Sequence, residues 1–290
     1  MILPIIAALL AFRSAALAAP TALAASEVSS IQKAFFSSGN QWNDSSAPAR
    51  ALVSGSSGAN LEMSQTPKLL EGVYRIVCMG DSITAAGDPG HGYVSVLRKT
   101  LRALYPDQNF EVINVGIGGQ KAPDMLARWD RDVIQKNPDL VTLSVGINDV
   151  WHGFYDNHPK GDGPRGIDIE TYKVDVAKMI DSALAHHMKI VLVSPTVITE
   201  DATKLENKKL QGYVDAERRI AADRHIPFVE LHGVFLGRLA KLRTGPEDKT
   251  LHLTLDGVHM QGPGDNLMTY NLLLGMGVPK GDIVDLAPTG

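Results

Sequence analysis

Short apolar runs alternate with longer segments of helical periodicity along most of this chain. Apolar runs with few polar positions predict strands buried on both faces, and they cover Ile76–Met79, Phe110–Val115, Leu140–Val145, Lys189–Val193 and Ile226–Leu231. In other segments apolar residues recur three or four positions apart, which predicts helices over Tyr93–Leu104, Met125–Ile134, Tyr172–Leu184, Leu205–Arg224, Val234–Leu242 and Gly264–Met276. This regular pattern extends from Val73 to about Val278.

The alternation of strands and helices predicts a mostly parallel sheet with helices on both faces. Five strands fit a flavodoxin-like three-layer α/β/α sandwich around a central five-stranded sheet. Right-handed crossovers put the carboxyl ends of parallel strands at the same edge of the sheet. Ser82, Gly119 and Asn148 each follow a strand, so they should converge on one rim. Open sheets of this class bind their ligands there.

The chain before the regular region divides into two parts. Residues 1–25 resemble a cleaved secretory signal, because a mostly apolar run precedes two small-x-small patterns, and we expect a secreted or periplasmic protein. No basic residue precedes that run and Arg13 interrupts it, so a wrongly assigned start or a disordered extension is the alternative. Residues 26–70 are rich in Ser, Ala, Gly and Asn and predict a linker or arm with a short helix near Val28–Phe36. One catalytic domain over 71–278 and an irregular tail over 279–290 complete the expected organisation.

Composition and charge narrow the class of partner. The 290 residues include 44% hydrophobic and 21% charged residues, an ordinary globular balance. A net charge of −4 provides neither a basic surface for nucleic acid nor a polybasic face for anionic membranes. The N-terminal apolar run is too short to span a bilayer, and no cysteine directly follows it to carry a lipid anchor. We therefore expect no nucleic-acid partner and no stable membrane anchor, and the single cysteine, Cys78, excludes an intrachain disulfide.

Two short motifs carry candidate chemistry at opposite ends of the regular region. Gly80-Asp81-Ser82 directly follows the first strand, where the serine is either a nucleophile or the cap of the next segment. Asp256-Gly-Val-His259 supplies an acid and a base three residues apart, so both side chains can reach one point at the start of the last helix. A helix cap beside a surface histidine is the alternative interpretation. A serine nucleophile needs such a base and orienting group, together with donors for the oxyanion.

These motifs are part of four ordered blocks that resemble the SGNH hydrolase superfamily, the GDSL-type esterases and lipases. The resemblance covers about Arg75–Val278, and its blocks are Gly80-Asp81-Ser82-Ile83-Thr84, Asn114-Val115-Gly116-Ile117-Gly118-Gly119, Gly146-Ile147-Asn148-Asp149 and Asp256-Gly-Val-His259. Four blocks in the right order are far more specific than any one of them. The superfamily has a flavodoxin-like fold, in agreement with the strand count. The chain lacks the Gly-x-Ser-x-Gly motif of α/β-hydrolases, which argues against that fold.

The resemblance implies a serine esterase that hydrolyses carboxylic esters through an acyl-enzyme. Ser82 is the implied nucleophile, His259 the base, and Asp256 the residue that orients His259. The N–H groups of Ser82 and Gly119 and the side-chain amide of Asn148 are the implied oxyanion donors. A thioesterase or lysophospholipase that acts on longer acyl chains is the alternative within the class. A catalytically inactive carbohydrate-binding relative is the alternative outside it, and no cofactor is expected.

The segment Trp151–Gly166 follows the third block and should border the site. Trp151, Phe154 and Tyr155 lie there among polar residues, four glycines and two prolines, and they either wall the pocket or pack beneath the segment. A pocket for a long acyl chain should be mainly apolar, so this segment favours acetyl and other short acyl groups on a polar alcohol such as a sugar. The expected partner is therefore a small-molecule or glycan ester, and the oligomeric state stays open.

The remaining polar residues carry weaker signals. Asp81 is a further candidate for substrate binding, although Asp81 and Asp149 are better placed to hold their loops. His152, Asp156, His158 and Asp162 are close in sequence, but no helix or hairpin sets them at ligand spacing, so no metal site is expected. We expect surface positions for the histidines at the ends of elements, which are His186, His187, His225 and His232.

Overall fold

A central sheet of parallel strands organises the residues that the computed structural model describes, which are 65–88, 90–245 and 247–287. The strands are β1 (Arg75–Met79), β2 (Glu111–Asn114), β3 (Leu140–Ser144), β4 (Lys189–Val193) and β5 (Phe228–Val229). They lie in the order β2-β1-β3-β4-β5, and every neighbouring pair is parallel. This order confirms the predicted flavodoxin-like fold.

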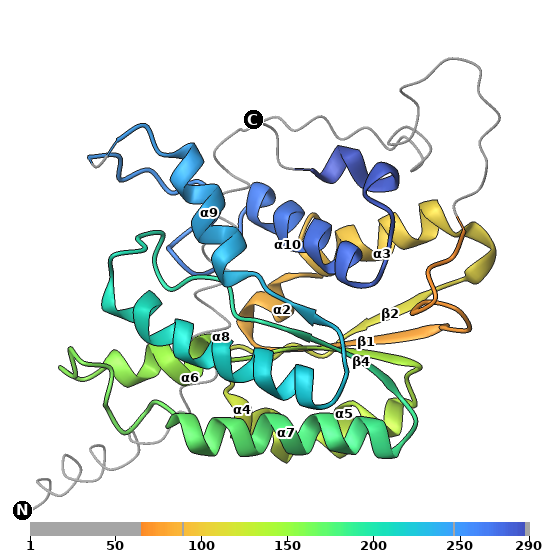
Figure 1. Cartoon of the computed structure of the whole chain (residues 1–290), viewed down its shortest axis with the longest axis horizontal. Helices are drawn as coiled ribbons and strands as arrows, with labels where there is room; N and C mark the ends of the chain where they lie inside the picture. The colour runs from red at the N-terminus through yellow and green to blue at the C-terminus, as the bar shows by residue number, and fades with distance from the viewer. Residues whose placement is uncertain (1–64, 89, 246, 288–290) are drawn as a thin grey trace, which may run out of the picture. The chain divides into compact units, whose positions relative to one another are not determined.

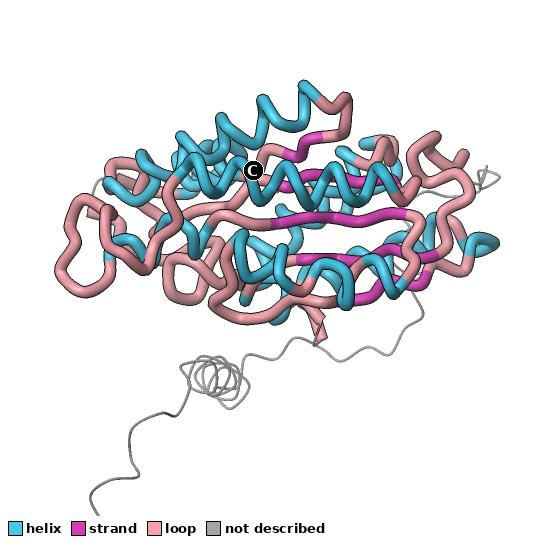
Figure 2. Tube along the Cα trace, turned by 90° about the horizontal axis from the view of Figure 1, so that it is seen from below, coloured by secondary structure: helices cyan, strands magenta, loops and turns pink. Residues whose placement is uncertain are grey.

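Helices cover both faces of this sheet (Figures 1 and 2). The α-helices are α2 (Ser82–Ala86), α3 (Tyr93–Leu104), α4 (Ala122–Ala127), α5 (Trp129–Asp132), α6 (Ile147–Trp151), α7 (Ile169–Ala185), α8 (Leu205–Asp223), α9 (His232–Leu242) and α10 (Gly262–Gly275). Short 3₁₀ helices cover Pro106–Gln108, Ile134–Lys136, His152–Phe154 and Lys280–Leu286. α3 packs against α10 on one face, and α7 packs against α4 and α8 on the other (Figure 1).

Local sequence explains why these elements form where they do. Residues 76–79 of β1 are fully buried, as expected for a central strand with helices on both faces. α7 begins at a strong cap, since Asp168 Oδ1 accepts the N–H groups of Glu170 and Thr171 at 3.1 and 3.0 Å. Its buried residues include Tyr172, Val176, Met179, Ile180 and Ala183, which form one helical face.

The strand order places a topological switch point beside β1. The chain leaves β1 for β2 on one side and then crosses to β3 on the other, so β1 and β3 flank the point where the order reverses. Open α/β sheets bind ligands outside the carboxyl ends of the strands at such a point. α2 begins soon after β1 and α6 soon after β3, which brings Ser82 and Asn148 to this rim.

The prediction of one helix over Met125–Ile134 is wrong, because α4, α5 and a 3₁₀ turn replace it. At the break between α4 and α5, Arg128 has φ −108° and ψ 5°, outside the helical region. Its guanidinium group is buried and donates to the carbonyl groups of Val115 at 2.7 Å and Gly80 at 3.2 Å. These long-range bonds hold Arg128 inward and account for the interruption.

Strand β5 is shorter than the predicted Ile226–Leu231. Pro227 has no N–H for the sheet, and proline is tolerated chiefly at edges of this kind. Beyond Val229 the N–H of Leu231 donates to the Ser194 hydroxyl at 2.7 Å instead of continuing a strand. Proline at one end and a side-chain acceptor at the other therefore limit the edge strand to two residues.

Two predicted loops contain regular structure. The tail after Pro279 is predicted to be irregular, but Lys280–Leu286 forms 3₁₀ turns on either side of a kink at Ile283, whose side chain is buried against the core. The polar loop expected from Trp151 begins instead with the last turn of α6 and the 3₁₀ turn His152–Phe154.

The predicted signal, the helix near Val28–Phe36 and most of the predicted linker lie outside the described residues. The described end of that linker packs on the folded region, since Leu70 is fully buried and Gln108 Nε2 donates to the Thr66 hydroxyl at 2.9 Å. Across the described ranges, we find no helix with the length and apolar character needed to cross a membrane.

Candidate active site

Ser82 lies where the carboxyl end of β1 passes into α2. Asp81 caps α2, because its Oδ1 accepts the N–H of Ile83 at 2.9 Å, and the helix therefore begins at Ser82 itself. Asp81 and Ile83 are buried, whereas Ser82 between them is partly exposed. The turn thus presents the Ser82 hydroxyl at the rim while its neighbours anchor it.

The loop after β2 packs directly on this turn. A Cβ on Gly116 would come 2.2 Å from a backbone nitrogen of α2, so only glycine allows this approach. Asn114 fixes the contact, since its Oδ1 accepts the Gly116 N–H at 2.8 Å and its Nδ2 donates to the Thr84 carbonyl at 2.6 Å. A Cβ built on Gly118 would lie 3.8 Å from Cβ of Ser82. The second block therefore lies beside the first.

Asp256 and His259 lie in a loop rather than at the start of the last helix, which corrects the sequence expectation. An antiparallel bridge between Thr254 and Met260 closes this loop, and α10 begins only at Gly262. The loop, and not a helix dipole or a helical face, therefore sets the direction of both side chains.

A continuous chain of hydrogen bonds joins the acid, the base and the serine. Asp256 Oδ1 accepts the N–H groups of Val258 at 2.9 Å and His259 at 2.8 Å. Its Oδ2 lies 2.6 Å from His259 Nδ1, and His259 Nε2 lies 2.9 Å from Ser82 Oγ. This is the spacing of a nucleophile, a base and an orienting carboxylate.

Asp256 and His259 stabilise each other's charged forms. Burial alone would raise the pKa of Asp256, but the hydrogen bond and charge of His259, with two backbone N–H groups, outweigh burial and lower it to about 2. Burial lowers the pKa of His259, but the hydrogen bond and charge of Asp256 and the charge of Asp81 outweigh burial and raise it above the usual 6.5. His259 is therefore a stronger base than a free imidazole.

Gly119 and Asn148 border the same rim. Asn148 is buried at the start of α6, and its Nδ2 donates to the Gln120 carbonyl at 3.0 Å. A primary amide has two N–H donors, so one remains for a ligand. Gly119 has φ +76°, and a Cβ there would meet no atom within 4 Å, so the space on that side of Gly119 is open. The bond to Gln120 links the second and third blocks.

Two buried carboxyl groups lie beneath the rim. Burial raises the pKa of Asp81 to about 6 and that of Asp149 to about 7, although backbone N–H groups oppose the shift in both. Asp149 Oδ1 accepts the N–H of Ala122 at 2.9 Å, as Asp81 accepts that of Ile83. Both carboxyl groups thus hold backbone in place, and substrate contact by Asp81 stays a prediction.

The predicted aromatic residues gather at the end of α6. The Tyr155 ring lies 5.7 Å from that of Trp151 and 4.8 Å from that of His152, measured between centroids. Trp151 and Phe154 are partly buried and pack against the core. Phe154 lies against Gly161, where a Cβ would come 2.4 Å from its ring. Tyr155 packs on the rings of Trp151 and His152, and the Arg165 guanidinium lies 4.8 Å from its ring centroid.

The polar residues of the neighbouring segment form pairs rather than a cluster. His158 Nδ1 lies 3.4 Å from an Asp162 oxygen, and Asp156 lies 3.6 Å from the guanidinium group of Arg165. In the described ranges, no three His, Cys, Asp or Glu side chains are arranged to hold a metal ion.

The predicted surface position of His232 is wrong. Its side chain is 1% exposed, its Nδ1 bonds the Thr196 carbonyl, and its backbone N–H donates to the Ser194 hydroxyl at 3.3 Å. The other three histidines in that prediction are exposed as expected.

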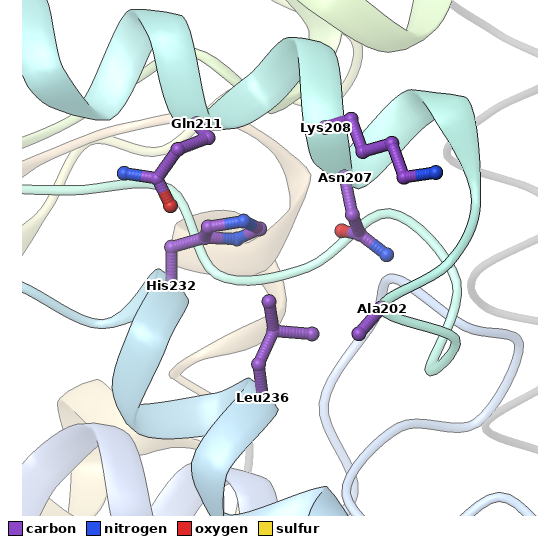
Figure 3. Close-up of a pocket in the computed structure, with 6 residues that line it drawn as sticks. All are labelled: Ala202, Asn207, Lys208, Gln211, His232 and Leu236. Carbon is purple, nitrogen blue, oxygen red and sulfur yellow. The ribbon is translucent and has the colours of Figure 1, made fainter.

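A pocket of about 290 Å³ lies between α8 and α9, and its lining includes no predicted site residue (Figure 3). It is lined by Ala202, Asn207, Lys208, Gln211, His232 and Leu236. The side chains of His232 and Gln211 face each other across it (Figure 3).

The structure adds one residue that the sequence analysis did not identify. Arg128 bridges the first and second blocks, because it donates to the carbonyl groups of Gly80 and Val115 and to the neighbouring Gln120 Oε1. In sequence it is one polar position in a helical pattern, and nothing local distinguishes it from a solvent-exposed arginine.

Comparison with known proteins adds independent information. A model of the GDSL-like lipase/acylhydrolase family matches residues 78–259. An acetylxylan esterase from Geobacillus stearothermophilus is 27% identical over 172 residues, which cover 56% of this chain and 77% of that protein. An arylesterase from Vibrio mimicus is 34% identical over 86 residues, covering 28% of this chain and 40% of that protein.

Solved structures agree with these relationships. The crystal structure of the Geobacillus acetylxylan esterase superposes with a TM-score of 0.62 at 27% identity, over 71% of this chain and 95% of that chain. An α/β hydrolase enzyme from the metagenome of Lake Arreo superposes with the same TM-score and coverage at 25% identity. Catalytic mutants of the acetylxylan esterase replace a serine, an aspartate and a histidine, the last two being three positions apart.

Proposed function

The chain belongs to the GDSL-like lipase/acylhydrolase family, the SGNH hydrolases, and is a carboxylic ester hydrolase; on this premise we propose that it removes short acyl groups, acetyl first, from a carbohydrate or a similar polar alcohol. The observation that carries the proposal is the hydrogen-bonded chain from Asp256 through His259 to Ser82, with its 2.9 Å contact at the serine oxygen.

Ser82 attacks the ester carbonyl while His259 Nε2 takes its proton. The tetrahedral intermediate collapses when His259 gives that proton to the leaving alcohol, which leaves an acyl-enzyme on Ser82. Water then attacks the acyl group, again with His259 as base, and the acid departs as Ser82 regains its proton. Asp256 holds the ring so that Nδ1 carries the hydrogen and Nε2 is free to accept.

The oxyanion in both steps needs donors that are already in place. We assign this role to the N–H groups of Ser82 and Gly119 and to the second amide hydrogen of Asn148. Ser82 is the first residue of α2, where helix N–H groups have no partner within the helix. The bond from Asn148 to the Gln120 carbonyl orients the amide before substrate arrives.

The surroundings of Asn148 support a carbohydrate as the alcohol. Trp151 and His152 follow Asn148 by three and four positions on the turn that continues from α6, so all three share one face. Burial, with the charges of nearby Lys121 and Arg165, lowers the pKa of His152 to about 4, so its ring is neutral at pH 7. Neutral and aromatic rings beside hydrogen-bonding groups suit a sugar better than a long acyl chain.

Acyl chain length tests this proposal. We expect kcat/KM to be highest for p-nitrophenyl acetate and at least about tenfold lower for the octanoate and palmitate, because the segment Trp151–Gly166 has no apolar run to line a pocket for a longer chain. A kcat/KM that rises toward the palmitate would replace the proposal with a lysophospholipase or thioesterase.

Tyr155→Ala should raise KM for an acetylated xylo-oligosaccharide but not for p-nitrophenyl acetate. The matched control is Tyr74→Ala, because Tyr74 is an exposed tyrosine at the opposite end of β1.

The pH profile tests the role of His259. Only the neutral ring accepts a proton, so kcat/KM should fall about tenfold per pH unit below the His259 pKa. Because Asp256 and Asp81 raise that pKa, we expect the half-maximum above pH 6.5. The measurement is kcat/KM for p-nitrophenyl acetate between pH 4 and 9, and a profile that stays flat well below pH 6.5 would contradict the assignment.

The organisation of the chain stays part of this proposal. We assign catalysis to residues 71–278, a cleaved secretory signal to residues 1–25 and an arm to residues 26–70, which makes the enzyme secreted or periplasmic. The apolar run and small-x-small patterns of the N-terminus support export, and N-terminal sequencing of the mature protein decides it.

A further inference from the structure

A buried carboxylate outside the proposed catalytic residues binds the chain just before the Asp256–His259 turn. Glu200, in the loop between β4 and α8, is 3% exposed. Its Oε1 accepts the N–H groups of Leu253 and Thr254, both at 2.7 Å, and the Thr254 hydroxyl at 2.8 Å. Its Oε2 accepts the N–H of His252 at 2.8 Å. These four bonds fix three consecutive residues on one side chain.

Thr254 links this anchor to the turn. Its hydroxyl donates to Glu200 and accepts the Gly257 N–H at 3.0 Å. Gly257 has φ +97°, a conformation that favours glycine, and a Cβ there would lie 3.1 Å from the Thr199 Cα. The Asp256–His259 turn is therefore bonded to one side of the Glu200 loop and packed against its backbone.

The loop that carries Glu200 is itself held firmly. Thr199 has φ +64°, which a β-branched residue rarely adopts. Asn207 of α8 donates to the carbonyl groups of Thr199 and Asp201 at 3.1 and 2.9 Å, and the guanidinium group of Arg243 donates to the Glu200 carbonyl. A strained backbone persists where its surroundings over-determine it, so this loop is a fixed reference for the turn.

We propose that Glu200 is a positioning residue for ester hydrolysis: through Thr254 it sets the place of the Asp256–His259 turn and so keeps His259 Nε2 within 2.9 Å of Ser82 Oγ. The inference rests on the roles given to His259 and Ser82 above. Glu200 touches neither substrate nor the reacting atoms. Its influence is on the distance across which the proton moves, where a displacement of about 1 Å costs about 10²-fold in rate.

Glu200→Gln tests this without changing the size of the side chain. The amide oxygen can serve the three donors at the Oε1 position, but the NH₂ group then faces the His252 N–H, so donor opposes donor. We expect kcat to fall about 10- to 100-fold with KM changed less than about twofold, because the Glu200 side chain is buried and bonded within the protein. Glu71→Gln, at an exposed glutamate, is the matched control and should keep wild-type kinetics.

A second pair of variants keeps the test valid if Glu200→Gln does not fold. Thr254→Val removes the hydroxyl bridge with little change of shape and should lower kcat in the same way, whereas Thr254→Ser keeps the bridge and should restore most of it. The double variant of Glu200→Gln with Thr254→Val should lose little more than either single one, since both break one linkage.

Proton NMR distinguishes a positioning role from a purely structural one, because a purely structural role would leave the His259 Nδ1 proton resonance unchanged in the folded variants. The resonance of the His259 Nδ1 proton, held 2.6 Å from Asp256, should shift or broaden in Glu200→Gln and Thr254→Val at temperatures well below their melting points. Folded variants with wild-type kcat and an unchanged resonance would overturn the inference. So would a loss of activity that follows only the folded fraction.

The failure of the inference is distinct from the failure of the proposed function. A fluorophosphonate probe that labels wild-type enzyme at Ser82 establishes the nucleophile independently of Glu200. Labelled and active wild type beside fully active Glu200 variants would reject the positioning role alone. An unlabelled Ser82 would instead reject the proposed catalytic roles, and the positioning role with them.

Discussion

Ser82→Ala removes ester hydrolysis, with an expected fall in kcat of about 10⁶-fold, the loss typical of removing the nucleophile of a serine hydrolase. No other hydroxyl is bonded to His259 in the described residues, so the variant has no route to an acyl-enzyme. The fold should survive, because Ser82 is partly exposed and the change deletes one oxygen atom. The measurements are kcat for p-nitrophenyl acetate, fluorophosphonate labelling and the melting temperature.

Ser182→Ala is the matched control for that variant. Ser182 lies on α7 with its side chain partly exposed, and its substitution should leave activity and stability unchanged. A folded Ser82→Ala protein that retains most of its activity would assign the nucleophile to a different residue.

Asp256→Asn should lower kcat by about 10⁴-fold, comparable to the loss of the orienting aspartate in serine proteases. The two carboxylate oxygens of Asp256 have different hydrogen-bond partners. Oδ1 accepts the N–H groups of Val258 and His259, and Oδ2 faces His259 Nδ1. The amide oxygen must take the first position, which places the NH₂ group against Nδ1. The ring then keeps its hydrogen on Nε2, and it can no longer accept the proton of Ser82.

The control and the readout for this variant follow from the same geometry. Asp223→Asn, at an exposed position at the end of α8, should change neither kcat nor the melting temperature. Nitrogen-15 NMR of the His259 ring should report a hydrogen on Nε2 in Asp256→Asn and on Nδ1 in the wild type. A loss of less than about tenfold with the wild-type tautomer would show that Asp256 does not orient the ring.

Local pattern was enough to predict the sheet and the family. The apolar run of β1 and the periodic face of α7 are encoded within a few residues, because burial on both faces or on one face imposes its own spacing. The four blocks can likewise be recognised in the sequence, because each is a short motif that combines a strand end or a turn with residues of specific chemistry. The family assignment and the parallel five-stranded sheet are both confirmed.

The geometry of the candidate site is harder to predict from the sequence than the sheet is. Ser82 and His259 are 177 positions apart, and their hydrogen bond exists only after the sheet brings both ends of the chain to one rim. The same holds for the bond from Asn148 to the Gln120 carbonyl, which joins two blocks. The sequence predicts these residues as a set, but it predicts a helix start at Asp256 and His259, where the structure has a bridged loop.

The sequence by itself predicted most of the elements and the candidate site residues, whereas only the tertiary structure decided how those residues are held. Arg128 breaks a predicted helix and Glu200 becomes a buried anchor, although in sequence each is an ordinary charged residue. The physical reason is that burying a charge is costly unless partners satisfy it. Asp132, four positions away, pairs with Arg128, but the other partners include backbone groups 48 positions from Arg128 and 54 from Glu200, which no local pattern contains.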